Sequence, residues 1–175
     1  MNGADEKIVR EKSADGGAED GKVLEVRNLN VRLNTRDGRL HVVRDVSFAL
    51  RSGETLVTVG ESGCGKSMTA RALMRLLPDE MAEVPESSRI LYRGQDLLRL
   101  TEREMQHVRG RSLAMVFQDP STSLDPTLTI GEQVEETLLL HTRLRGPERR
   151  LRVLEMLHAV GISSPETRMR QYPHE

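Results

Sequence analysis

Hydrophobic and polar residues alternate along two stretches near the start of the chain, and this period of two indicates β-strands. The apolar positions of these stretches are Leu24, Val26, Leu29, Val31 and Leu33, and then Val46, Phe48 and Leu50. The dipeptide Asp37-Gly38 lies between them and is typical of a hairpin turn. A short, mostly apolar run at 56–59 follows and predicts a central strand that is buried on both faces.

Helical signals dominate the rest of the chain. Residues 66–77 predict a helix that Pro78 ends. Capping-box sequences begin at Thr101 and Thr129 and predict two further helix starts, while Pro147 predicts the first turn of a helix that ends near Gly161. Short apolar runs at 90–92 and 113–117 predict strands. We therefore expect strands first and a mostly helical second half.

Composition and charge narrow the class of protein. The 175 residues carry 26 Lys plus Arg against 27 Asp plus Glu, a net charge of −1, so no basic surface predicts a nucleic-acid partner. Cys64 is the single cysteine and fits a reducing compartment. No stretch approaches the ~18 consecutive apolar residues of a membrane span. We expect a cytoplasmic chain with a charged, disordered tail over 1–21 and one domain over 22–175.

A glycine-rich segment between the strand at 56–59 and the helix at 66–77 carries the clearest chemistry. Its sequence fits G-x-x-x-x-G-K-[S/T], in which the backbone curls into a nest of N–H groups that binds phosphate. Lys66 would supply a positive charge to the β and γ phosphates, and the Ser67 hydroxyl a ligand for Mg²⁺. We expect the cofactor-binding residues to be Gly60, Glu61, Ser62, Gly63, Cys64, Gly65, Lys66, Ser67 and Met68.

Within this loop Cys64 occupies a spacer position, for which we expect no chemical role. The loop alone also fits an unrelated P-loop kinase or GTPase, although no guanine-recognition motif accompanies it.

Further motifs make the prediction more specific. Three segments accompany the loop: Met115-Val116-Phe117-Gln118-Asp119-Pro120, Ser123-Leu124-Asp125-Pro126 and residues 128–133. Together with the loop, they resemble the ATP-binding subunits of ABC transporters of the oligopeptide and dipeptide importer type. The resemblance runs from about Leu24 to Glu175. It implies an α/β fold: a P-loop NTPase core with a parallel sheet, an N-terminal antiparallel β subdomain and the start of the helical subdomain, that is, a truncated ABC ATPase domain. The implied cofactors are ATP and Mg²⁺.

The resemblance also assigns roles and partners. Gln118 aligns with the family's Q-loop glutamine, which implies that it contacts Mg²⁺ and acts in catalysis together with Lys66. The stretch from Asp119 to Ile130 is where such proteins meet their membrane partners. The implied partners are transmembrane permease subunits and a second ATP-binding subunit, identical or different. The implied location is the cytoplasmic face of the plasma (inner) membrane, as a peripheral protein.

Two features depart from the family pattern. Residues 21–47 contain no Phe, Tyr or Trp to stack on adenine, so His41 or an aliphatic neighbour would take that place, unless His41 is an ordinary surface histidine. The signature motif, the Walker B strand and the switch histidine do not occur among the 175 residues. The sequence predicts an importer subunit that couples ATP hydrolysis to uptake of oligopeptides, dipeptides or similar small solutes, or alternatively a truncated, inactive nucleotide-binding module. We do not expect this chain to hydrolyse ATP alone.

Overall fold

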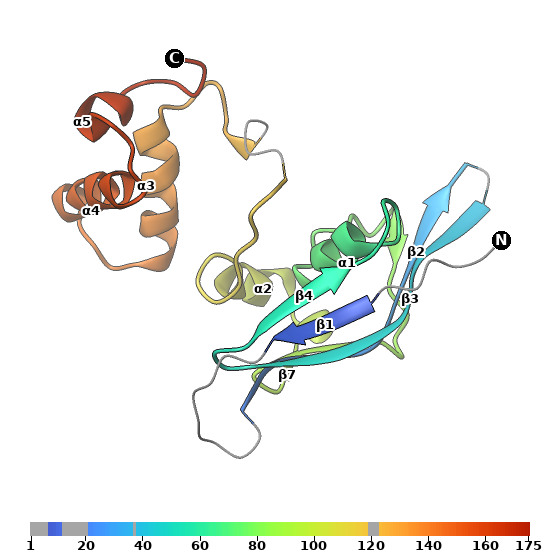
Figure 1. Cartoon of the computed structure of the whole chain (residues 1–175). Coiled ribbons are helices and arrows are strands. Elements are labelled where there is room, and N and C mark those ends of the chain that lie inside the picture. The colour runs from blue at the N-terminus through green and yellow to red at the C-terminus, as the bar shows by residue number, and fades with distance from the viewer. Residues whose placement is uncertain (1–6, 12–20, 37, 119–122) are drawn as a thin grey trace. The chain divides into compact units, whose positions relative to one another are not determined.

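The computed structural model describes residues 7–11, 21–36, 38–118 and 123–175 (Figure 1). Contacts divide the chain into two compact units, Met1–Met105 and Gln106–Glu175. The strands are β1 (Lys7–Glu11), β2 (Lys22–Thr35), β3 (Gly38–Arg51), β4 (Thr55–Val59), β5 (Ala82–Glu83), β6 (Arg89–Tyr92) and β7 (Gln95–Asp96). The helices are α1 (Lys66–Leu73), the 3₁₀ helix η1 (Leu97–Arg99), α2 (Glu102–Val108), α3 (Ile130–His141), α4 (Gly146–Ala159) and α5 (Pro165–Arg168).

An antiparallel sheet forms most of the first unit, in the order β3-β2-β6-β7, with β5 also paired to β2. The predicted hairpin of β2 and β3 and the predicted strand at 90–92 are confirmed. Asp37 of the hairpin turn lies outside the described residues. Helix α1 packs against β2 and β3. The buried hydrophobic residues of this unit are Val26, Leu29, Val31, Val43, Ala72, Ile90, Leu97 and Met105.

Strand β2 contains a bulge where the apolar period changes phase. Val26 pairs with Phe48 and Leu29 pairs with Val46, so β2 has one residue more than β3 between the two pairs. Asn28 lies at the bulge with a positive φ of 49°. The extra residue keeps Val26 and Leu29 both buried, which explains why three positions rather than two separate them in the sequence.

Ser88, which lies just before β6, holds this bulge through two hydrogen bonds. Its side chain is only 1% exposed, and its Oγ accepts a hydrogen bond from the Asn30 amide at 3.1 Å and donates one to the Asn28 carbonyl at 2.9 Å. In Ser88→Ala the Asn30 amide loses this partner, whereas the Asn28 carbonyl keeps a hydrogen bond from Asn30 Nδ2 at 2.9 Å. We therefore expect the free energy of unfolding to fall by about 1 kcal/mol in urea denaturation. The neighbouring Ser87 is exposed and provides the control. Ser87→Ala should change the free energy of unfolding by less than about 0.5 kcal/mol.

The prediction for the strand at 56–59 is wrong in its burial and pairing. Among the described strands, β4 pairs with β1 alone, and the pairing is antiparallel. Val57 is 43% exposed and Val59 is 50% exposed. A strand is buried on both faces only where neighbouring strands extend the sheet and helices cover it on both sides. With one strand neighbour, β4 does not meet this condition.

The expected disordered tail over 1–21 needs a correction for Lys7–Glu11, which form β1. Ile8 and Val9 are β-branched, and β4 offers a row of backbone groups with which such a segment can pair. Gly21 also has a defined place, because its carbonyl accepts a hydrogen bond from the Ser52 amide at 3.0 Å. The other residues of the tail lie outside the described residues.

The strand predicted at 113–117 is wrong as well. Leu113 makes an isolated bridge with Arg109, and the residues from 114 to 118 have no regular secondary structure. Val116 is 93% exposed. An apolar run becomes a strand only when a neighbouring strand supplies hydrogen-bond partners, and no described strand pairs with this run.

Helix α1 begins at Lys66 as predicted but ends four residues earlier than the predicted Leu77. Arg75 adopts a positive φ of 50°, its amide bonds to the Ala72 carbonyl at 3.0 Å, and the Leu76 amide bonds to the Arg71 carbonyl at 2.9 Å. These two bonds form a Schellman motif, which satisfies the last carbonyls of the helix. The local backbone therefore ends α1 before Pro78 is reached.

The second unit is helical, as predicted. Helices α3, α4 and α5 surround a core that consists of Val153, Leu157 and Met169, against which pack Ile130, Val134, Leu138 and Leu154. The predicted starts at Thr129 and Pro147 and the predicted stop at Gly161 are confirmed. Helix α5 was not predicted.

The capping box at the start of α3 gives a pH-dependent prediction. The hydroxyl and amide of Thr129 donate to the Glu132 carboxylate at 2.7 and 2.8 Å, and the hydroxyl bond, followed by the amide bond, lowers the pKa of Glu132 below 4.5. A carboxyl whose pKa is lower in the folded state stabilises the fold above its unfolded pKa, and the stabilisation disappears as pH falls through the folded pKa. Glu132→Gln should therefore flatten the decline of stability below pH 4.5, measured by urea denaturation across pH. Thr129→Ala, which removes the hydroxyl that lowers the pKa of Glu132 most, should flatten the decline in the same direction.

Candidate functional site

The glycine-rich segment joins β4 directly to α1, so the structure places the predicted loop between a strand and a helix. This order is the context that a phosphate-binding loop requires. Gly63 and Gly65 have positive φ values of 84° and 105°, and Gly65 is the residue that precedes the first turn of α1. The chain therefore turns twice within the loop before it enters the helix.

Lys66 points its ammonium group back into this loop. Its Nζ donates to the carbonyls of Gly60 and Glu61, both at 2.7 Å, and lies 3.3 Å from Cys64 Sγ. Sequence reasoning placed Cys64 in the cofactor-binding loop without a chemical role for its side chain, whereas the structure makes its sulfur a neighbour of the cation. An anion that enters the loop meets a positive charge that the loop itself already holds in place.

The back of the loop rests on β3. A Cβ built at Gly65 would lie 2.5 Å from the Val42 carbonyl oxygen, closer than any side chain can approach. Gly65 is itself buried. Only glycine fits between the loop and the β3 backbone in this conformation. Val42 therefore supports the loop, a role that sequence reasoning missed because nothing in the Val42-Val43 pair distinguishes it from other strand residues.

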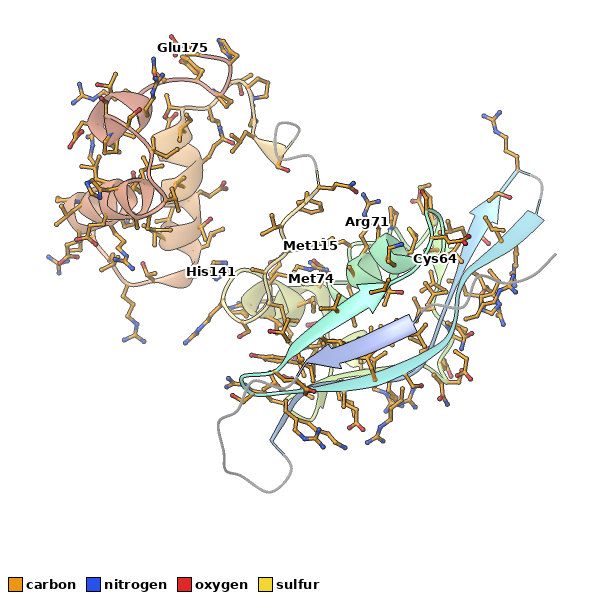
Figure 2. All side chains as sticks on the ribbon, in the orientation of Figure 1. Cys64, Arg71, Met74, Met115, His141 and Glu175 are labelled. Carbon is orange, nitrogen blue, oxygen red and sulfur yellow. The ribbon has the colours of Figure 1, made fainter. Side chains whose placement is uncertain are left out.

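Helix α1 contributes its N-terminal end to the loop. The first N–H groups of a helix lack partners within it, and the helix dipole places partial positive charge there. The helix is held in place by Thr69 and Ala72, which are buried, whereas Ala70 and Leu73 are only half-buried. Figure 2 shows Cys64 at the loop, Arg71 further along α1 and Met74 just after the end of the helix.

Ser67 is exposed at the start of α1 and Met68 is half-buried beside it. The described residues include no cluster of three or more His, Cys, Asp or Glu that would hold a metal ion unaided. Mg²⁺ is commonly bound by one or two protein oxygens together with phosphate oxygens and water. The Ser67 hydroxyl next to the phosphate loop fits such a shared Mg²⁺ site.

The structure therefore brings the predicted residues from Gly60 to Met68 into one loop and helix start. Gln118 belongs to the second unit, where it is exposed in the irregular segment after Leu113. His41 is half-buried on β3, and its Nε2 lies 2.9 Å from the Asn30 Oδ1. Its ring is thus engaged within the sheet. The roles of Gln118 and His41 stay predictions.

Similarity to characterised proteins agrees with this geometry. A family model described as ABC transporter matches residues 43–175. The chain is similar to the dipeptide transport ATP-binding protein DppD of Bacillus subtilis (strain 168), with 49% identity over 154 residues, 88% of this chain and 46% of that protein. It is also similar to the oligopeptide transport ATP-binding protein OppD of the same organism, with 44% identity over 88% of this chain and 43% of that protein. The chain spans less than half the length of these two relatives.

Solved structures give the same fold. A dimeric structure of MJ0796, described as a bacterial ABC transporter cassette, superposes with a TM-score of 0.70 and 22% sequence identity over 86% of this chain and 62% of that chain. A second structure of this cassette is described as bound to ADP and phosphate and superposes equally well. At this identity the likeness concerns the fold. In the part of the chain that the structure describes, no helix has the length and apolar character that crossing a bilayer requires.

Proposed function

The chain belongs to the ABC transporter family, and from this membership we propose that it is the ATP-binding part of an importer that takes up oligopeptides, dipeptides or similar small solutes. Residues 22–175 would form part of one nucleotide-binding domain. The observation that carries the proposal is the loop from Gly60 to Ser67, which ends at the start of α1 and holds the Lys66 ammonium 2.7 Å from two of its own carbonyls.

This arrangement suits the phosphates of ATP. The backbone amides of the loop and the N-terminal end of α1 would bind phosphate oxygens, and Lys66 would move from the Gly60 and Glu61 carbonyls to the β and γ phosphates. Mg²⁺, when bound, would neutralise phosphate charge. The Ser67 hydroxyl would be one protein ligand, and Gln118 is the second ligand that the family resemblance implies. In the proposed role Gln118 and Lys66 act in hydrolysis.

The relatives suggest how the protein would work in the cell. DppD and OppD are described as transport ATP-binding proteins, and MJ0796 as a dimer. We propose that the chain associates with transmembrane permease subunits and with a second ATP-binding subunit on the cytoplasmic face of the inner membrane, as a peripheral protein. Nucleic acid is not an expected partner, since the net charge is −1.

The Mg²⁺ part of the proposal predicts a selective effect at Ser67. We expect Ser67→Ala to bind ATP in the absence of Mg²⁺ as the parent does, and to lose most of the increase in affinity that Mg²⁺ provides, because the hydroxyl ligand is gone. Isothermal titration calorimetry with and without Mg²⁺ measures both affinities. Ser52→Ala, an exposed serine in the turn before β4, is the control that should keep the full Mg²⁺ effect. An unchanged Mg²⁺ effect in Ser67→Ala would contradict the assignment.

Competition and turnover assays test the function itself. Mg-ATP should displace a fluorescent ATP analogue, and displacement by GTP in preference to ATP would instead support a GTPase. ATP hydrolysis by the purified chain, lost in Lys66→Ala, would exclude the alternative of an inactive nucleotide-binding module. Binding without turnover would support that module.

A further inference from the structure

One side chain of α3 reaches back to the segment that leads into the helix. Gln133 lies near the start of α3, and its Oε1 accepts a hydrogen bond from the Asp125 amide at 2.8 Å. Its Nε2 donates to the Asp125 carbonyl at 2.9 Å and to the Leu128 carbonyl at 3.0 Å. The reverse orientation of the carboxamide would set an N–H against an N–H and an oxygen against two carbonyls, so only this orientation satisfies all three partners. A single side chain thus serves three backbone groups of residues 125–128.

Residues 125–128 form a turn that the local sequence also favours. The Leu128 amide donates to the Asp125 carbonyl at 3.3 Å, and Pro126 occupies the second position, where its fixed φ suits a β-turn. The Thr127 amide and hydroxyl donate to Asp125 Oδ1 at 2.8 and 2.6 Å. All four residues are exposed, so burial contributes little to the position of the turn. The turn is held by hydrogen bonds, and those of Gln133 join it to α3.

The turn presents apolar surface in a stretch that matters for assembly. It lies within residues 119–130, where the family resemblance places the contact with membrane partners. Leu128, which ends the turn, and Leu124, directly before it, are each 40% exposed. A segment that is already ordered binds a partner without the entropic cost of ordering it first. The order of the turn should therefore affect how well this surface binds.

We propose that Gln133 is a positioning residue for partner contact. Its carboxamide fixes the 125–128 turn on α3, and with the turn the exposed side chains of Leu124 and Leu128, in one shape before a permease subunit binds. The role toward the permease rests on the proposed function, whereas the link between Gln133 and the turn does not. The two parts of the proposal therefore have separate tests.

Residue-resolved hydrogen exchange of the full chain, followed by NMR, tests the link to the turn. Gln133→Leu removes all three hydrogen bonds, whereas Gln133→Glu keeps the acceptor and sets a carboxylate against two carbonyls. We expect the Asp125 amide to exchange about tenfold faster in Gln133→Leu and about threefold faster in Gln133→Glu. Helix propensity does not predict this order, because Gln, Glu and Leu are all good helix formers.

Thr137→Leu is the matched control, because Thr137 is exposed one turn further along α3. We expect its Asp125 amide to exchange at the parent rate. Parent-like exchange in Gln133→Leu, or equally fast exchange in Thr137→Leu, would overturn the proposal. If Gln133→Leu also disturbs α3, which exchange at 138–141 would reveal, Gln133→Glu decides, and parent-like exchange at Asp125 in that variant would overturn the proposal.

Sedimentation with membranes tests the role toward the partner. The probe is urea-washed inner-membrane vesicles of the native cells, with protein-free liposomes as the reference. We expect the parent and Thr137→Leu to bind the vesicles and Gln133→Leu to bind about fivefold more weakly, while all three keep the Mg-ATP rise in melting temperature. Equal binding by the parent and Gln133→Leu would overturn the positioning role. Absence of binding by the parent would contradict the permease partner of the proposed function, and the exchange experiment decides separately whether Gln133 fixes the turn.

Discussion

Lys66→Ala should abolish the thermal stabilisation of the chain by Mg-ATP. A ligand at a hundredfold excess over its dissociation constant stabilises the folded state by about 2.7 kcal/mol. For a chain of this size that corresponds to a rise in melting temperature of about 5–11 °C in the parent protein. The alanine removes the ammonium that the loop holds beside Gly60 and Glu61, and with it the main charge for the phosphates. We expect a shift close to zero in the variant, measured by differential scanning fluorimetry.

Arg71→Ala is the matched control for this experiment. Arg71 is an exposed cation on the same helix, one turn beyond the loop, and its loss changes the net charge by the same amount (Figure 2). We expect Arg71→Ala to keep the full Mg-ATP shift. The absence of any shift in the parent, with the chain shown to be folded by circular dichroism, would argue against nucleotide binding. A full shift in Lys66→Ala would show that the nucleotide binds elsewhere.

Gly65→Ala should destabilise the first unit by about 3–4 kcal/mol, measured by urea denaturation. Two effects add in this variant. The φ of 105° disfavours any residue with a Cβ, and the new methyl group would meet the Val42 carbonyl oxygen at 2.5 Å. Because that oxygen belongs to the backbone of the main sheet, neither the loop nor β3 can move away cheaply.

Gly63→Ala separates these two effects. Gly63 also has a positive φ, of 84°, but a Cβ there would have no atom within 4 Å. We therefore expect only the backbone contribution, a loss of about 1 kcal/mol. Equal losses in the two variants would show that contact with Val42 contributes nothing, and that the loop does not rest on β3.

Local signals in the sequence were sufficient for most elements and for the loop. The hairpin of β2 and β3, the capping boxes at Thr101 and Thr129, and the helix start at Lys66 each depend on residues a few positions apart. The same holds for the glycine loop, in which the residue types and their spacing define the phosphate chemistry. These features were predictable because each is stabilised mainly by its own backbone and immediate neighbours.

Predictions failed where an element depends on distant partners. The runs at 56–59 and 113–117 have nearly the same apolar character, yet one pairs with β1 and the other forms no ladder. Sequence could not reveal this, since ladder hydrogen bonds come from whichever segment lies alongside. The end of α1 at Leu73 was missed for another reason: the local Schellman motif has Arg75 rather than a glycine at its positive φ, so the sequence carries no signal for it. The Arg75 guanidinium also donates to the distant carbonyls of Leu97 and Leu100 at 3.2 and 2.6 Å.

The sequence by itself thus determined the family, the type of most elements and the residues of the loop, because motif spacing and period are properties of adjacent residues. Only the tertiary structure decided which strand flanks β4, that the Val42 carbonyl limits Gly65 to glycine, and that Lys66 lies against the carbonyls of its own loop. The first two of these contacts join segments that are tens of residues apart, whereas the Lys66 contact spans five or six residues and depends on how the loop is folded. Chain packing brings such segments together, and the local pattern of hydrophobic and polar residues carries no record of it.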